Sequence, residues 1–144
     1  MLNTLRCIGS VLLLVPSATA STLNLTVATQ HGNTSALLGD ACCTSANKAN
    51  CVSYARCLTH NKLPHLFSTC AAKKANSNTP PDRGREGCVL FRTGNPKYCH
   101  AEYIQGAIGS TYHLMQADWP DASAGCTTTT LPKKDSVIIG VWCP

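Results

Sequence analysis

The sequence predicts a small α+β protein held together by disulfide bonds, an α/β sandwich in which two helices cover one face of an antiparallel sheet. Three observations predict it: an export signal at the amino terminus, many cysteines beyond that signal, and short apolar segments that alternate between strand and helix periodicity. Residues 21–144, which remain after export, suffice for one domain and one core.

The first 20 residues have the composition of a secretion signal. Arg6 supplies a weak positive charge, residues 7–15 are almost entirely apolar, and residues 18–20 are small, as signal peptidase requires. The apolar run is about half as long as the ~20 residues of a membrane-spanning helix, so a membrane anchor is the weaker interpretation. We expect cleavage before Ser21, a secreted, extracellular protein, and no stable membrane insertion.

Nine of the ten cysteines lie beyond the signal, a density that is typical of a disulfide framework in an exported protein. Four bridges would leave one thiol, which is free, buried, or paired with a second copy as a disulfide-linked dimer. No C-x-x-C pair occurs and export exposes thiols to oxidation, so we expect no metal and no cofactor. The disulfide candidates are Cys42, Cys43, Cys51, Cys57, Cys70, Cys88, Cys99, Cys126 and Cys143.

Two N-glycosylation sequons, at Asn24 and Asn33, lie near the expected mature amino terminus. Apolar and polar residues alternate over residues 22–27, which is the period of a strand with one buried face. Asn24 belongs to the polar face, where a glycan has room.

The middle of the chain predicts a loop, a helix and a second loop. Residues 31–40 are rich in Gly, Asn, Thr and Ser and lead into the first cysteines. From residue 47 to residue 59, apolar residues recur at spacings of four and three and predict a helix. Residues 71–87 are rich in Asn, Pro and charge, which predicts an exposed, mobile loop in which Lys73 and Lys74 are ordinary surface lysines.

The carboxy-terminal half predicts a strand, a helix and a strand. Residues 88–91 are short and apolar, as in a central strand. Residues 136–142 are rich in β-branched side chains, as in an inner strand buried on both sides. Between residues 97 and 117 the apolar side chains recur at spacings of three and four and predict a long helix: Ala101, Ile104, Ile108, Tyr112 and Met115.

The chain is modestly basic, with a formal net charge of +5. Its paired lysines and the cluster Arg83, Arg85 and Arg92 could face an anionic surface. No long basic run with interleaved aromatic residues occurs, so we interpret the charge as a source of solubility and expect no nucleic-acid partner.

No catalytic motif is present, and we expect that the protein is not an enzyme. A secreted ribonuclease would need a base, an acid and an arginine for the phosphate, and residues of these types are present: His100, Glu102, His113 and Arg92. On the expected helix the two histidines lie about 20 Å apart along the axis, too far to share one phosphate. His60 or His65 would have to reach the site from elsewhere.

Chitin binding would need an exposed aromatic platform. Trp119 and Tyr98 are the candidates, since Trp142 belongs to the expected inner strand. Packing in a core or a loop is the default interpretation of both residues.

The carboxy-terminal half resembles the killer toxins first known from virus-infected smut fungi, which are small secreted α/β sandwiches. The family runs Cys-Ala-Phe-Leu-Gln-x-Thr, a helix, Gly-Cys and a closing strand, and the corresponding segments here are 88–95, 97–117, 125–126 and 136–142. Thr127 to Thr130 replace the family's next cysteine, and its opening motif survives only in part at residues 39–45. The resemblance implies the fold more than an activity, because no lysine here aligns with the family's functional basic residues.

The whole chain is similar to fungal effectors, which are short, exported, rich in cysteine and without catalytic motifs. This resemblance implies a secreted effector of a plant-pathogenic fungus that binds a host protein or cell-surface target, promotes virulence or is recognised by resistance proteins. Action outside host cells and later entry into them both stay open. The alternatives are a killer-toxin-like antifungal or membrane-channel-directed toxin and, further, a secreted ribonuclease or a chitin-binding protein.

Overall fold

The computed structural model describes residues 37–95, 98–120 and 122–144. The expected signal peptide, the strand expected over residues 22–27 and the sequons at Asn24 and Asn33 lie outside the described residues. Within the described ranges, no helix has the length and apolar character that crossing a membrane requires.

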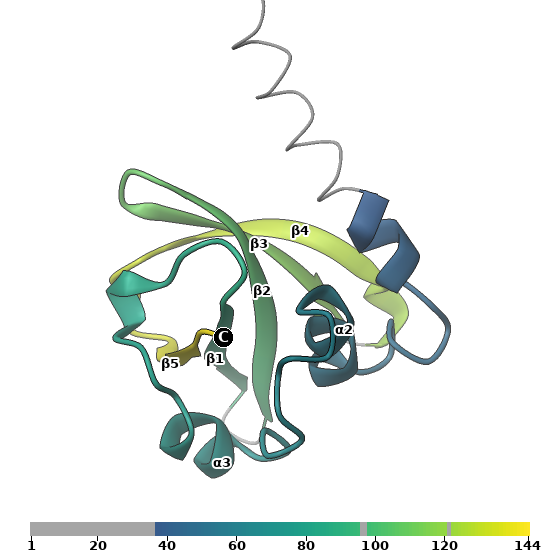
Figure 1. Ribbon diagram of the computed structural model, residues 1–144, viewed down its shortest axis with the longest axis horizontal. Coiled ribbons are helices and arrows are strands. Elements are labelled where there is room, and N and C mark those ends of the chain that lie inside the picture. Colours follow the sequence, from purple (N-terminus) through teal and green to yellow (C-terminus); the bar gives the residue numbers. More distant parts are fainter. Residues whose placement is uncertain (1–36, 96–97, 121) are drawn as a thin grey trace, which may run out of the picture.

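A five-stranded antiparallel sheet forms the centre of the fold (Figure 1). The order across the sheet is β4-β3-β2-β1-β5, so neighbours in sequence are neighbours in the sheet except for β5, which returns to pair with β1. The predicted α+β class with an antiparallel sheet is confirmed. The strands are β1 (Val89–Asn95), β2 (Tyr98–Ile108), β3 (Thr111–Ala117), β4 (Cys126–Pro132) and β5 (Ile138–Trp142).

Two helices, α2 (Cys51–Leu58) and α3 (Cys70–Ala75), cover one face of this sheet. Each begins at a capping side chain: Asn50 accepts a hydrogen bond from the Ser53 N–H, and Thr69 accepts one from the Ala72 N–H. In Figure 1, α2 lies against β2, and α3 lies at the end of the sheet where β2 begins. A short helical segment over residues 37–42 packs beside α2 on the same face.

The core has two layers because both faces of the sheet are covered. On the helix side, Phe91 and Ala101 pack against Phe67 and the inner face of α2. On the opposite side, the Tyr112 hydroxyl donates to the Pro81 carbonyl and accepts from the Gly84 N–H, which fastens the η1 segment (Pro81–Arg83) over the sheet. Residues at both odd and even positions along the strands are therefore buried.

Four disulfides staple these layers, as the cysteine count predicted. Cys42–Cys57 and Cys43–Cys126 tie the segment before α2 to α2 and to β4, Cys70–Cys99 ties α3 to β2, and Cys88–Cys143 ties the start of β1 to the chain end. Cys51, at the start of α2, is the free cysteine of the described residues.

The helix predicted over residues 97–117 is wrong, since this segment is the β2–β3 hairpin. Gly109 and Ser110 form its two-residue turn, because Ile108 pairs with Thr111 and Gly109 has φ 55°. Ile104 and Tyr112 pack on one face of the sheet, and Ala101 and Met115 on the other. Burial of both faces places apolar residues at odd and even positions, and their spacings of three and four imitate a helix.

Three smaller expectations also change. Residues 71–87 are not one long loop, since they contain most of α3 and the η1 segment, and Lys73 is buried. The last strand, β5, was expected to be an inner strand but lies at the edge of the sheet beside β1. On its outer side, Thr79 forms a bridge with Val141. The expected loop over residues 31–40 becomes helical from residue 37. The helix predicted within residues 47–59 is confirmed as α2.

Candidate functional site

A half-open groove of about 1190 Å³ lies at the end of the sheet where β2 begins. Its walls come from the amino-terminal half of α2, from α3 with the turn before it, from the start of β2, and from residues 118–120 after β3. Residues distant in sequence meet here because Cys70–Cys99 holds α3 against β2. The lining side chains include Cys51, Arg56, Lys73, His100 and Trp119.

Two cations from different helices line the groove. Arg56 donates from Nε to the Leu63 carbonyl (3.0 Å), and its Nη1 lies 2.8 Å from Nδ1 of the exposed His65. The Lys73 side chain is only 4% exposed and donates from Nζ to the Cys99 carbonyl (2.5 Å). Burial lowers the pKa of Lys73, because the ammonium loses water that one neutral carbonyl does not replace.

The free thiol of Cys51 shares this groove. Burial raises its pKa, and the nearby Lys73 and the backbone of Ala101 offset part of that rise. The sulfur is therefore held as a thiol, which is a poor nucleophile compared with a thiolate.

Trp119 covers the start of β2. Its ring lies 5.0 Å from the His100 ring, and the Arg92 guanidinium stands 4.7 Å from the indole centroid. Gly94 makes this position possible, since a Cβ there would overlap the indole ring. Burial, with the charges of Arg92 and Lys73, lowers the pKa of His100 to about 3, so its imidazole is neutral at ordinary pH.

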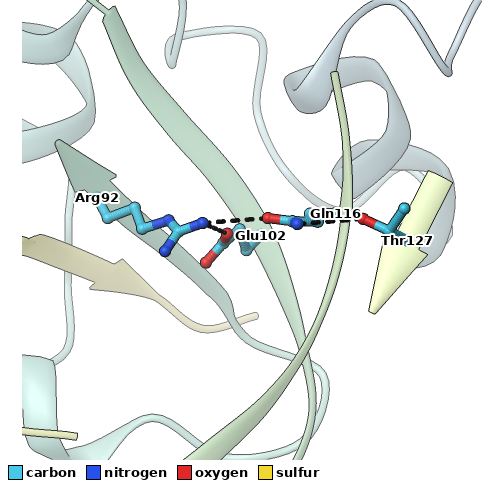
Figure 2. Close-up of polar contacts among 4 residues, drawn as sticks. All are labelled: Arg92, Glu102, Gln116 and Thr127. Carbon is cyan, nitrogen blue, oxygen red and sulfur yellow. Dashed lines mark hydrogen bonds and ion pairs between the residues drawn. The ribbon is translucent and has the colours of Figure 1, made fainter. Parts of the chain in front are cut away.

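A polar chain that begins at Arg92 crosses four strands (Figure 2). Arg92 Nη2 lies 2.8 Å from Glu102 Oε1 and donates to Gln116 Oε1 (3.2 Å), and Gln116 Nε2 donates to Thr127 Oγ1 (3.1 Å). The Glu102 side chain is fully buried, and burial raises its pKa to about 7 although Arg92 pulls it down. Glu102 Oε2 and His100 Nε2 meet no hydrogen-bond partner within the described part of the chain.

The ribonuclease candidates divide into two groups. Arg92, His100 and Glu102 do come together, because Arg92 pairs with His100 across β1 and β2 and Glu102 follows two residues later on β2. His113 stands apart: it pairs with Gly106, six residues along β2 from His100, or about 20 Å at 3.3 Å per residue. The separation expected of the two histidines holds, although the helix used to derive it does not exist.

Of the other two histidines named for the ribonuclease, one lies at the groove, and the aromatic candidates for chitin binding form no exposed platform among the described side chains. His65 reaches the groove that contains His100, whereas His60 is exposed and is not among the groove residues. Trp119 is half-buried by its stacking and is not a flat exposed platform, and Trp142 packs edge-on against Phe67. Tyr98 is the first residue of β2.

Sequence reasoning missed Lys73 as a groove residue. The signal was present: Thr69 is a good helix cap, and the alanine-rich run after it favours a helix. Lys73 stands three residues after Cys70, so both point to the same side of that helix, and the disulfide at Cys70 makes that side the inner one.

Within the described ranges, no three His, Cys, Asp or Glu side chains are arranged to hold a metal ion. No family model, no curated protein and no solved structure matches the chain.

Proposed function

We propose that the protein is a secreted effector of a plant-pathogenic fungus that acts by binding a host protein or cell-surface target, without catalytic turnover. Four disulfides in a chain of this size support an oxidising, extracellular setting. The groove offers a hollow with two cations and an aromatic edge, which suits binding.

The observation that carries the non-enzymatic part is the burial of the acid–base residues. Glu102 is fully buried in a pair with Arg92, and Trp119 lies over both Arg92 and His100. A general acid or base must come within hydrogen-bond distance of the group it serves. Arg92 holds Glu102 away from the groove lining, so a substrate in the groove would meet His100 without its candidate acid–base partner.

The test applies the purified, oxidised protein to plant leaf tissue, fungal cells, RNA and insoluble chitin. Host-specific cell death or suppressed defence supports the proposal, and growth arrest of fungi would instead favour the killer-toxin-like alternative. Arg56→Glu, which reverses a groove charge, should abolish the plant response. Lys134→Glu makes the same change at an exposed residue outside the groove and should retain it.

A secreted ribonuclease is the second candidate, because Arg92, His100 and Glu102 lie together on one part of the sheet. RNA cleavage by the wild-type protein that is lost in His100→Ala, with the fold retained, would overturn the non-enzymatic proposal. Chitin binding that is lost in Trp119→Ala would overturn the host-target proposal in favour of wall binding.

A further inference from the structure

We propose that the groove binds the phosphate group of a small soluble molecule between Arg56 and Lys73. The inference goes beyond the effector proposal, because it concerns a chemical group that the groove recognises in solution and needs no host tissue to be measured.

The first support is the charge of the groove. Arg56 comes from α2 and Lys73 from α3, and both line the same hollow. Asp118 is the one carboxylate among the described lining residues. Two cationic side chains against one carboxylate give the groove a net positive potential where a ligand would enter.

The second support is that neither cation has a carboxylate partner within the described ranges. Among the described residues, Arg92–Glu102 is the one ion pair, so Arg56 and Lys73 each rely on neutral groups. A buried ammonium normally requires a charged partner, because burial removes the water that stabilised it. The Lys73 ammonium has three N–H donors, and the Cys99 carbonyl takes one of them.

The third support is a buried ring nitrogen of His100 in the same hollow. His100 is 4% exposed and lines the groove, and its Nε2 meets no partner within the described part of the chain. A neutral imidazole carries one ring N–H, and the tautomer with that proton on Nε2 donates a hydrogen bond into the groove without adding charge. Buried polar atoms of a folded protein are normally satisfied, and a ligand in the groove can satisfy this one.

These donors favour phosphate over a carboxylate. They approach from two helices and from the sheet, and a tetrahedral phosphate presents oxygens in several directions whereas a carboxylate presents two in one plane. Guanidinium and ammonium groups are the usual phosphate partners in proteins. The groove volume of about 1190 Å³ far exceeds one phosphate, which leaves room for the rest of a small molecule beside Trp119.

The experiment titrates inorganic phosphate and then pyrophosphate into the disulfide-intact protein at constant ionic strength. Trp142→Phe removes the other tryptophan of the chain, so that the fluorescence reports on Trp119 at the groove. Calorimetry gives the affinity independently. Alkylation of Cys51 gives a third readout, because a ligand that fills the groove should slow it at least several-fold.

Variants locate the site. Arg56→Gln and Lys73→Met should each weaken phosphate binding at least tenfold. Lys74→Gln removes the same charge from the neighbouring, exposed residue of α3 and should leave the affinity unchanged. If Lys73→Met does not fold, as judged by its near-ultraviolet circular dichroism, Arg56→Gln decides alone.

Absence of phosphate binding would overturn the inference, and so would equal weakening by Lys74→Gln or equally tight binding of acetate. Binding of RNA or of anionic lipid vesicles without binding of phosphate or pyrophosphate would overturn it as well. The leaf assay tests the effector proposal separately. A protein that binds phosphate in solution can fail to cause a plant response, and a protein that causes one can fail to bind phosphate.

Discussion

Glu102 and His100 stand two residues apart on β2, and burial acts on them in opposite directions. It raises the pKa of Glu102 to about 7 and lowers that of His100 to about 3, because in each case it disfavours the charged form. Arg92 moderates the first shift and reinforces the second, and Lys73 adds to the second.

These shifts predict how stability depends on pH. The contribution of Glu102 is present below its ordinary pKa of 4.5 and is lost as the pH rises through about 7. The contribution of His100 is present above its ordinary pKa of 6.5 and is lost as the pH falls toward about 3. The two compensate between pH 4.5 and 6.5, so the pair gives a plateau there and a decline on either side.

Glu102→Gln should remove the decline near neutral pH. Because the amide has no charge to bury, we expect the free energy of unfolding of the variant, relative to wild type, to rise by about 2 kcal/mol between pH 5 and pH 8. Urea unfolding of the disulfide-intact proteins at the two pH values measures it. Glu86→Gln changes the same charge at an exposed position and controls for net charge. A relative stability that falls between pH 5 and pH 8 would contradict the assignment.

Cys51 should behave as a protected thiol. It is half-buried in the groove and burial raises its pKa, so we expect alkylation at pH 7.5 to be at least tenfold slower than that of cysteine in a short peptide and to become fast in denaturant. Mass spectrometry after alkylation should find one label under denaturing, non-reducing conditions. Isolation of a dimer linked through Cys51 would show that the thiol is more accessible than its position in the groove allows.

The sequence alone predicts β1, β5 and α2, but it does not predict the β2–β3 hairpin. The β1 and β5 segments are predictable because they are short, apolar and bounded by glycine or by polar residues. The α2 helix is predictable because its buried residues Tyr54, Ala55 and Leu58 share one face, whereas its other residues are half-buried. The hairpin imitates a helix because Ile104 and Tyr112 pack under η1 while Ala101 and Met115 pack under the helices. Which faces of a sheet are buried depends on the tertiary structure. Because both faces are buried here, the alternation of apolar and polar residues expected of a strand does not appear in the sequence.

The hairpin turn offers a test of this element. Gly109 has φ 55°, a conformation that costs a residue with a Cβ about 1 kcal/mol. Gly109→Ala should therefore lower the free energy of unfolding by about that amount. Gly106, in the same hairpin, also has open space where an added methyl group would lie, but it belongs to β2, so Gly106→Ala should be neutral or slightly stabilising. Equal losses in the two variants, measured by urea unfolding, would argue against the turn as described.

The groove was beyond sequence reasoning for a related cause. Arg56, Lys73 and His100 come from three elements. The Cys70–Cys99 bond brings α3 to β2, and core packing brings α2 to the same strand. Nine cysteines allow many pairings, and spacing alone selects none of them. Nine cysteines predict four bridges and one leftover thiol, whereas only the structure shows that this thiol belongs to Cys51.

The disulfides close loops of very different length. Cys43–Cys126 spans 83 residues and Cys42–Cys57 spans 15. Chain-entropy arguments assign about 4.5 kcal/mol to the longer loop and about 3 kcal/mol to the shorter one. The longer bond also joins the segment before α2 to β4, at the far end of the sheet order.

Paired serine substitutions should show this difference. Removal of Cys43 and Cys126 should lower the melting temperature more than removal of Cys42 and Cys57. Expressed as free energies of unfolding at one temperature, the two losses should differ by about 1.5 kcal/mol. Calorimetric melting of the two double variants measures it. A larger loss for the shorter loop would mean that local packing around α2 outweighs loop length.

The neighbouring cysteines Cys42 and Cys43 bond to different partners, one in α2 and one at the start of β4. Because the two thiols are adjacent in the chain, the exchanged pairing, Cys42 with Cys126 and Cys43 with Cys57, is a near competitor during oxidation. An isomer of this kind has the same mass and the same thiol count as the native protein, so neither measurement reveals it. Material oxidised without a disulfide isomerase, as in a reducing bacterial cytosol followed by air oxidation, should be a mixture of the two isomers. Biosynthesis through a compartment that proofreads disulfides should yield one.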